Sequence, residues 1–141
     1  SYVGDRKEIT SYDLEQLTSS QTINQIFIML DAIARKQRDK VLTLYYDLIE
    51  LKESPFGILA LLARQCNQLL QVLGKDNGTI SKEIKIPAFA VGKLKDQSKM
   101  FSIEVLLNMV EACAKTDELI KTGKINDRVG VELILIQFSQ N

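Results

Sequence analysis

The sequence predicts an all-α protein, a helical bundle of six to eight helices. Apolar residues recur every three or four positions through most of the chain, which is the spacing of one helix face. Residues that begin and end helices stand at the edges of these stretches. Strand-like alternation occurs only at 129–138, and no partner strand is evident elsewhere. A bundle therefore accounts for the pattern better than a sheet.

The composition is that of one globular domain with a core of ordinary size. Of 141 residues, 45% are hydrophobic and 26% are charged. The 18 Lys and Arg equal the 18 Asp and Glu, which argues against a general attraction to nucleic acid or acidic membranes. The chain has no His, and Cys66 and Cys113 lie in apolar helical stripes. We therefore expect core thiols, no metal and no other cofactor.

Residues 1–20 form a mixed segment. Thr10 and Asp13 resemble a capping box that opens a short helix through Leu14 and Leu17. The chain begins with Ser1 instead of Met, which suggests a piece of a longer protein. No signal peptide or membrane span is evident, so we expect a cytoplasmic protein without membrane contact.

Two amphipathic helices follow, separated by a polar corner at 36–39. The apolar face of the first consists of Ile23, Ile26, Phe27, Leu30, Ile33 and Ala34. That of the second consists of Val41, Leu44, Tyr45, Leu48 and Leu51. Because the connection is so short, we expect the two helices to form an antiparallel pair.

The stretch from Ser54 to Gly74 predicts the central helix of the bundle. Ser54 supplies an N-cap oxygen, Pro55 suits the first helical position, and Gly74 suits the end. Apolar residues cover nearly the whole circumference, and Arg64 is the only charge. A helix of this kind is buried.

The second half of the chain predicts further helices. A loop at 75–78 precedes a short turn or helix at 79–86, and Pro87 begins another helix. Ser102 caps a long helix that runs to Ile120 and ends at 122–123. Its apolar stripe consists of Ile103, Leu106, Leu107, Val110, Cys113 and Ala114. Asp127 can cap a last element, for which we choose a helix because Val129, Leu133 and Ile136 fit one.

The sequence contains almost no enzymatic machinery. The segment from Gly74 to Gly78 lacks the GK[ST] ending of a phosphate-binding loop. The usual general base, His, is absent, and no Ser or Cys has a plausible activator nearby in sequence. We therefore expect no catalytic activity in these residues.

Two charged residues, Arg64 and Asp117, lie among apolar residues of the predicted helices. Asp117 is in line with Ile103 and Val110, and Lys121 follows one turn later. The simpler interpretation is a local Asp117–Lys121 ion pair at the edge of the core. In the alternative, Asp117 helps to neutralise Arg64 between two helices, and removal of either partner would cost ~3–5 kcal/mol.

Residues 79–99 imitate a helix-turn-helix. Lysines at 82, 85, 93, 95 and 99 outnumber Glu83 and Asp96. A recognition helix usually presents Arg, Asn or Gln to base edges, whereas this segment offers Lys and one Gln. A solvated lysine face is the simpler interpretation, and a DNA-binding regulator that uses 79–99 is the alternative function.

Five motifs occur together in a characteristic order: LALLARQ (59–65), KIPAFAVGKL (85–94), QSKMFS (97–102), DELIKTGKIND (117–127) and VELILIQF (131–138). They resemble the C-terminal part of the delta subunit of bacterial DNA polymerase III, a clamp-loader family. The similarity runs from about Gln21 to the end, and the piece Val3-Gly4-Asp5-Arg6 resembles the end of that family's lid domain.

The resemblance implies that 21–141 form the helical collar domain and that 1–20 are a short remnant of an AAA+ lid domain. In this family the collar is non-catalytic and packs against the other clamp-loader subunits, which together load the sliding clamp onto primed DNA in replication. The motor subunits use ATP, and the element that binds the clamp lies in an N-terminal domain absent here. Primer–template DNA is implied only as a weak or indirect partner.

The resemblance also implies which residues matter. Arg64 matches the ARQ motif of the family, and Asp117 with Lys121 matches its D-x-x-x-K-T-G motif, so we expect packing or interface roles. The loop after Lys121 is basic at Lys124 and Arg128. We interpret Lys121, Lys124 and Arg128 as a hypothetical contact with the end of the primer–template duplex. An unrelated helical scaffold remains a third alternative.

Overall fold

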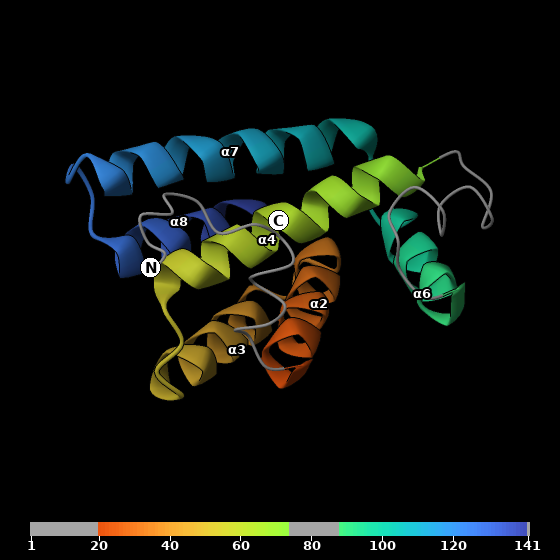
Figure 1. The fold of residues 1–141 in the computed structure, drawn as a ribbon, viewed down its shortest axis with the longest axis horizontal. Coiled ribbons are helices and arrows are strands. Elements are labelled where there is room, and N and C mark those ends of the chain that lie inside the picture. The colour runs from red at the N-terminus through yellow and green to blue at the C-terminus, as the bar shows by residue number, and fades with distance from the viewer. Residues whose placement is uncertain (1–19, 74–87, 141) are drawn as a thin grey trace.

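The computed structural model describes residues 20–73 and 88–140, and these residues form a bundle of six helices (Figure 1). No strand occurs within these two ranges, so the predicted all-α class is confirmed. The helices are α2 (Ser20–Ala34), α3 (Arg38–Glu50), α4 (Pro55–Val72), α6 (Ala88–Ser98), α7 (Ile103–Lys121) and α8 (Asp127–Ser139). The short helix expected after Thr10, the Gly74 cap and the segment 75–87 lie outside the described residues.

Side-chain caps fix the starts of three helices. The Ser54 hydroxyl accepts a hydrogen bond from the Gly57 amide (3.2 Å), as predicted for α4. Ser102 accepts from the Val105 amide (3.1 Å), which confirms the predicted cap of α7. The predicted cap of α8 is wrong by one residue. Asn126 Oδ1 accepts from the Val129 amide (3.1 Å), because Asn126 has the extended backbone of a cap while Asp127 is already helical.

The helix α4 lies at the centre of the described residues, as its sequence predicts. It packs against α2, α6, α7 and α8, with α7 on one side and α2 and α3 on the other (Figure 1). Its buried residues are Ile58, Leu59, Leu61, Leu62, Cys66, Leu69 and Val72. Burial on several sides explains why a single charge, Arg64, occurs in the helix.

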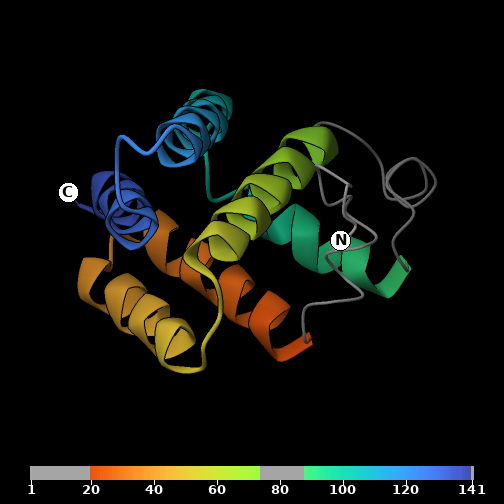
Figure 2. The ribbon, with the colours of Figure 1, turned by 60° about the vertical axis from the view of Figure 1, so that its left-hand side comes forward.

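The predicted pair formed by α2 and α3 is confirmed, and Figure 2 shows the two helices side by side, running in opposite directions. Their short connection turns at Lys36, whose φ is 60°. The Gln37 amide donates to the Ala32 carbonyl (2.9 Å), which closes the end of α2.

The helices α7 and α8 approach closely at Gly130, which is buried. A Cβ atom at this position would lie 3.1 Å from Thr116 Cγ2 and 3.5 Å from Ile120 Cδ1. The connection before α8 turns at Gly123, whose φ of +75° is readily adopted only by glycine. These two glycines explain how a five-residue connection folds α8 back against α7.

The apolar stripes of the last two helices are wider than their buried faces. In α7, Leu106 and Cys113 are buried, whereas Ile103 and Leu107 are 57% and 54% exposed. In α8, the residues that favoured a helix do not form its buried face. Val129 and Leu133 are exposed, and the buried residues are Gly130, Val131, Ile134, Leu135 and Ser139. Within the described ranges, no helix is both long enough and apolar enough to cross a bilayer.

Candidate subunit interface

Asp117 and Lys121 form an ion pair on the last turn of α7. Lys121 Nζ lies 3.0 Å from Asp117 Oδ2, one helical turn apart, and the lysine side chain is 60% exposed. Lys121 Nζ also lies 5.6 Å from the centroid of the Phe56 ring in the first turn of α4. The ion pair is the local interpretation predicted for Asp117 and Lys121. In addition, Lys121 joins the end of α7 to the start of α4 through the Phe56 ring.

Arg64 lies in the middle of α4 and is half-buried. The alternative in which Asp117 also neutralises Arg64 between α4 and α7 stays a prediction. In the described structure the carboxylate of Asp117 has the nearby partner Lys121.

The basic residues after Lys121 lie in different surroundings. Lys124 is exposed in the turn that follows α7, where its amide donates to the Leu119 carbonyl (2.8 Å). The Arg128 guanidinium lies 6.0 Å from the centroid of the Tyr46 ring of α3. Arg128 therefore lies toward α3, whereas Lys121 lies toward the start of α4.

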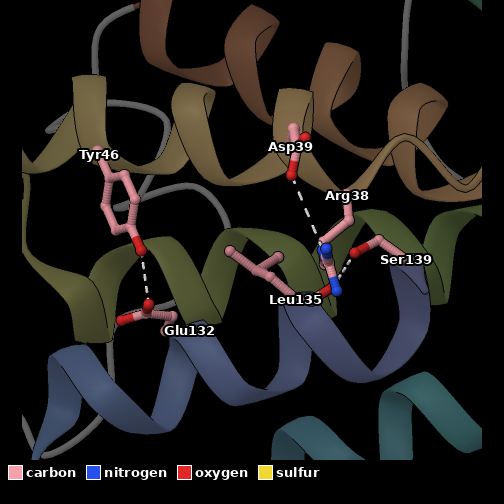
Figure 3. Close-up of polar contacts among 6 residues, drawn as sticks. All are labelled: Arg38, Asp39, Tyr46, Glu132, Leu135 and Ser139. Atoms are coloured by element: carbon pink, nitrogen blue, oxygen red, sulfur yellow. Dashed lines mark hydrogen bonds and ion pairs between the residues drawn. The ribbon is translucent and has the colours of Figure 1, made fainter.

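A contact between α3 and α8 holds the Arg128 region in place. The Tyr45 hydroxyl donates to the Arg128 carbonyl (2.8 Å), and the Tyr46 hydroxyl donates to Glu132 Oε2 (2.5 Å; Figure 3). Burial raises the pKa of Tyr45 above its ordinary value, and the hydrogen bond to Glu132 raises that of Tyr46. Both phenols therefore stay neutral donors at physiological pH.

Figure 3 also shows the Ser139 hydroxyl, which donates a hydrogen bond to the Leu135 carbonyl near the end of α8.

The balance of charge around these basic residues is not strongly positive. Between residues 117 and 132 the three cations Lys121, Lys124 and Arg128 share the sequence with the acids Asp117, Glu118, Asp127 and Glu132. A surface of this kind differs from the clustered basic patch typical of proteins that bind nucleic acid tightly.

The helix α6 carries the part of the helix-turn-helix imitation that the structure describes. Its single Gln, Gln97, is only 2% exposed. Gln97 Nε2 donates to the Phe27 carbonyl (2.9 Å), and its Oε1 accepts from Gln65 Nε2 (3.0 Å). A side chain held between α2 and α4 cannot reach a base edge. The exposed Lys93 lies 4.5 Å from the centroid of the Phe27 ring, which agrees with a solvated lysine face.

A groove of about 1030 Å³ lies between the start of α2 and the end of α3, and its lining includes Gln25, Tyr46, Glu50 and Arg128, which do not form a recognisable catalytic set. In the described part of the chain, no group of three or more His, Cys, Asp or Glu side chains is placed to hold a metal ion. Cys66 and Cys113 are free, buried thiols, as predicted.

Several large apolar side chains are exposed on α7 and α8. Ile103 and Leu107 on α7 and Leu133 on α8 are each more than half exposed, and Val129 is 45% exposed. Contiguous exposed apolar patches mark surfaces at which other proteins bind, and Ile103 and Leu107 lie one helical turn apart on α7. Sequence periodicity identified these residues as apolar but placed them in the core.

Comparison with known proteins identifies the family. The family model described as the DNA polymerase III delta subunit, C-terminal domain, matches residues 23–138, which span α2 to α8. The chain belongs to this family, and the resemblance found in its motifs is confirmed.

One curated relative and one solved structure come from the same organism. The chain is 32% identical to the DNA polymerase III subunit delta of Bacillus subtilis (strain 168), over 97% of this chain and 41% of that protein. The Bacillus subtilis DNA clamp loader delta protein (YqeN) has a similar structure, with a TM-score of 0.78, 32% identity, and coverage of 97% of this chain and 42% of that chain. The chain thus spans less than half of the length of these relatives.

Proposed function

We propose that this domain is the assembly module of a clamp-loader delta subunit, through which that subunit packs against the other subunits of the loader. The family match over residues 23–138 carries the proposal. The loader so assembled would place a sliding clamp on primed DNA during replication in the bacterial cytoplasm. The clamp itself would be bound by a domain outside these residues.

The surface chemistry of the domain supports an assembly role. The surface of α7 exposes the large apolar residues Ile103 and Leu107, which are 57% and 54% exposed. Protein–protein interfaces are depleted of charge at their centres and place apolar residues there. We assign Arg64, Asp117 and Lys121 to packing and interface roles at the α4–α7 side of the domain.

The domain is proposed to be non-catalytic. The described residues carry no His, because the whole chain has none, and their thiols are buried. Burial raises the pKa of Cys66 to about 12 and that of Cys113 to about 11, which leaves both thiols protonated and unreactive at physiological pH. Any chemistry of the loader would then reside in other subunits.

A contact with primer–template DNA is proposed as a secondary role for Lys121, Lys124 and Arg128. The exposure of Lys124 supports it, and the neighbouring acids limit it to a weak, sequence-independent contact with phosphates. The helix-turn-helix alternative is not favoured, because Gln97 is buried.

Reconstitution tests the assembly role. The full-length chain that contains this domain is mixed with the remaining purified clamp-loader subunits, and the mixture is separated by size-exclusion chromatography. We expect co-elution of all subunits. A second chain, shortened to remove residues 21–141, should elute apart from the others. Equal assembly by the full-length and shortened chains would contradict the proposal.

A further inference from the structure

A heptad repeat of apolar residues runs along a partly exposed side of α7. Along the outer side of the helix, positions 103, 107, 110, 114, 117 and 121 alternate in steps of four and three. The first four are Ile103, Leu107, Val110 and Ala114; Val110 is half-buried and packs against the edge of the core, and the other three are exposed. Steps of four and three place apolar residues along one seam, as at the a and d positions of a coiled coil. We call Ile103, Leu107, Val110 and Ala114 the outer seam.

A second heptad repeat on the same helix packs into the core of the domain. Leu106, Met109, Cys113, Thr116 and Ile120 follow steps of three and four on the side of α7 that packs against α4 and α8. Thr116 and Ile120 are half-buried. We call these five residues the inner seam. Leu106 is fully buried, and Met109 and Cys113 are 2% and 3% exposed. The inner seam therefore makes the main core contacts of α7, and most of the outer seam remains exposed on the surface of this domain. Figure 1 shows α7 along one long edge, with α4 and α8 on the same side of it.

The outer seam has a sharp end and a charged border. At its C-terminal end the two seam positions are occupied by the Asp117–Lys121 ion pair, so the apolar seam stops there. Glu104, Glu111 and Glu118 are exposed, seven residues apart, and each directly follows a seam position. In a coiled coil, residues at such flanking positions select the partner by charge.

We propose that the outer seam docks an amphipathic helix of a neighbouring clamp-loader subunit, and that this helix carries Lys or Arg along the edge that meets Glu104, Glu111 and Glu118. The inference rests on the proposed assembly role and names the face that performs it. The negative charges of Glu104, Glu111 and Glu118 favour a partner helix with a positively charged edge. A second copy of this chain is disfavoured, because antiparallel pairing of two outer seams would place the glutamate rows against each other.

The experiment measures the dissociation constant between the full-length chain and the remaining purified clamp-loader subunits. The variant I103E/L107E places charges in the seam. Its matched control, V129E/L133E, makes the same kind of change at α8 residues that are 45% and 52% exposed. We expect I103E/L107E to weaken assembly by about tenfold or more and the control to change it by less than about twofold. Circular dichroism and thermal melting of each variant confirm that it is folded.

The variant E104K/E111K tests the charged border without touching an apolar residue. Because both side chains are exposed, the variant should fold like the unmodified chain. We expect assembly to weaken severalfold at low salt and the loss to shrink as salt is added, since screening reduces repulsion. Unchanged affinity in this variant would contradict the proposal that the partner helix has a basic edge.

The outcomes separate the two levels of the proposal. If the unmodified chain assembles and I103E/L107E assembles equally well, or if the α8 control loses as much, the seam is overturned while the assembly role stands. If the unmodified chain does not assemble with these subunits, both the assembly role and the proposed docking at the outer seam are contradicted. If it self-associates through α7 instead, as shown by a dimer mass that I103E/L107E abolishes, the assignment of the partner is overturned.

Discussion

Gln97 Nε2 donates a hydrogen bond to Asp31 Oδ1 at 3.0 Å and thereby joins α6 to α2. The same amide group donates to the Phe27 carbonyl, and its oxygen accepts from Gln65 of α4. Three helices thus meet at one side chain that is 2% exposed. A buried polar group with its hydrogen bonds satisfied helps to fix one arrangement of helices, and it is costly when one partner is lost.

Gln97→Leu should destabilise the protein by about 1–3 kcal/mol, because Gln65 and the Phe27 carbonyl lose a partner. Urea unfolding followed by circular dichroism measures the change. Gln71→Leu on the exposed side of α4 is the control and should have little effect. A Gln97→Leu protein as stable as the unmodified one would show that the network adds nothing.

Tyr45→Phe should cost about 1 kcal/mol, because the Arg128 carbonyl loses the hydroxyl that bonds to it across α3 and α8. The ring itself stays, so no cavity forms. Tyr46→Phe, at a residue 37% exposed, is the matched control and should cost less. Thermal melting of the two variants compares them directly, and an equal loss in both would contradict the special role of Tyr45.

Gly130→Val should destabilise by about 1–3 kcal/mol, because the added atoms collide with Thr116 and Ile120 of α7. At Gly92 of α6 a Cβ meets nothing within 4 Å. Gly92→Ala should therefore stabilise by about 0.5–1 kcal/mol, through the higher helix propensity of alanine. Denaturant midpoints measure both, and a neutral Gly130→Val would mean that α7 and α8 are less tightly packed than described.

Local features of the structure could be predicted from the sequence because their causes are local. Ser54 and Pro55 define the start of α4, and Ser102 the start of α7, through signals within one helical turn. The same reasoning misplaced the cap of α8, since Asn126 and Asp127 are both good capping residues.

Features that depend on neighbouring helices could not be predicted from the sequence. Periodicity shows that Ile103, Leu107, Val129 and Leu133 are apolar, but not which residues a neighbouring helix covers. The hydrogen bond from the Tyr45 hydroxyl to the Arg128 carbonyl joins residues 83 positions apart, so no local sequence pattern predicts it. The two seams of α7 are both apolar in sequence, and only the packing of α4 and α8 distinguishes the buried one from the exposed one.

The two buried thiols predict a pH dependence of stability. Burial raises the pKa of Cys66 to about 12 and of Cys113 to about 11, from the ordinary value of 9.0. Well below pH 9 the thiols are protonated in both the folded and the unfolded states, so their contribution to the free energy of unfolding is constant. As pH rises above 9 the unfolded chain loses these protons first, and the free energy of unfolding falls until the folded thiols also ionise.

Urea midpoints between pH 7 and pH 10 test this dependence. The variant C66A/C113A should be less stable at pH 7, because it leaves cavities, but its stability should decline less between pH 9 and pH 10. Parallel declines in the variant and the unmodified protein would assign the alkaline loss to other groups.

Lys121→Ala/Lys124→Ala tests the contact with DNA. If both lysines meet phosphates, the affinity of the assembled loader for primed DNA should fall severalfold, and the slope of log K against log salt should decrease by about two. Lys40→Ala/Lys115→Ala removes two other exposed lysines and serves as the control. An unchanged affinity and slope in the first variant would refute the contact.

The molar mass of the complex formed with the remaining clamp-loader subunits tests the assembly role most directly. Light scattering on the full-length chain mixed with those subunits should give a mass that includes one copy of this chain. After removal of residues 21–141, the mass should be that of the other subunits alone. If the shortened chain is retained in the complex at the same stoichiometry, this domain does not hold the assembly together.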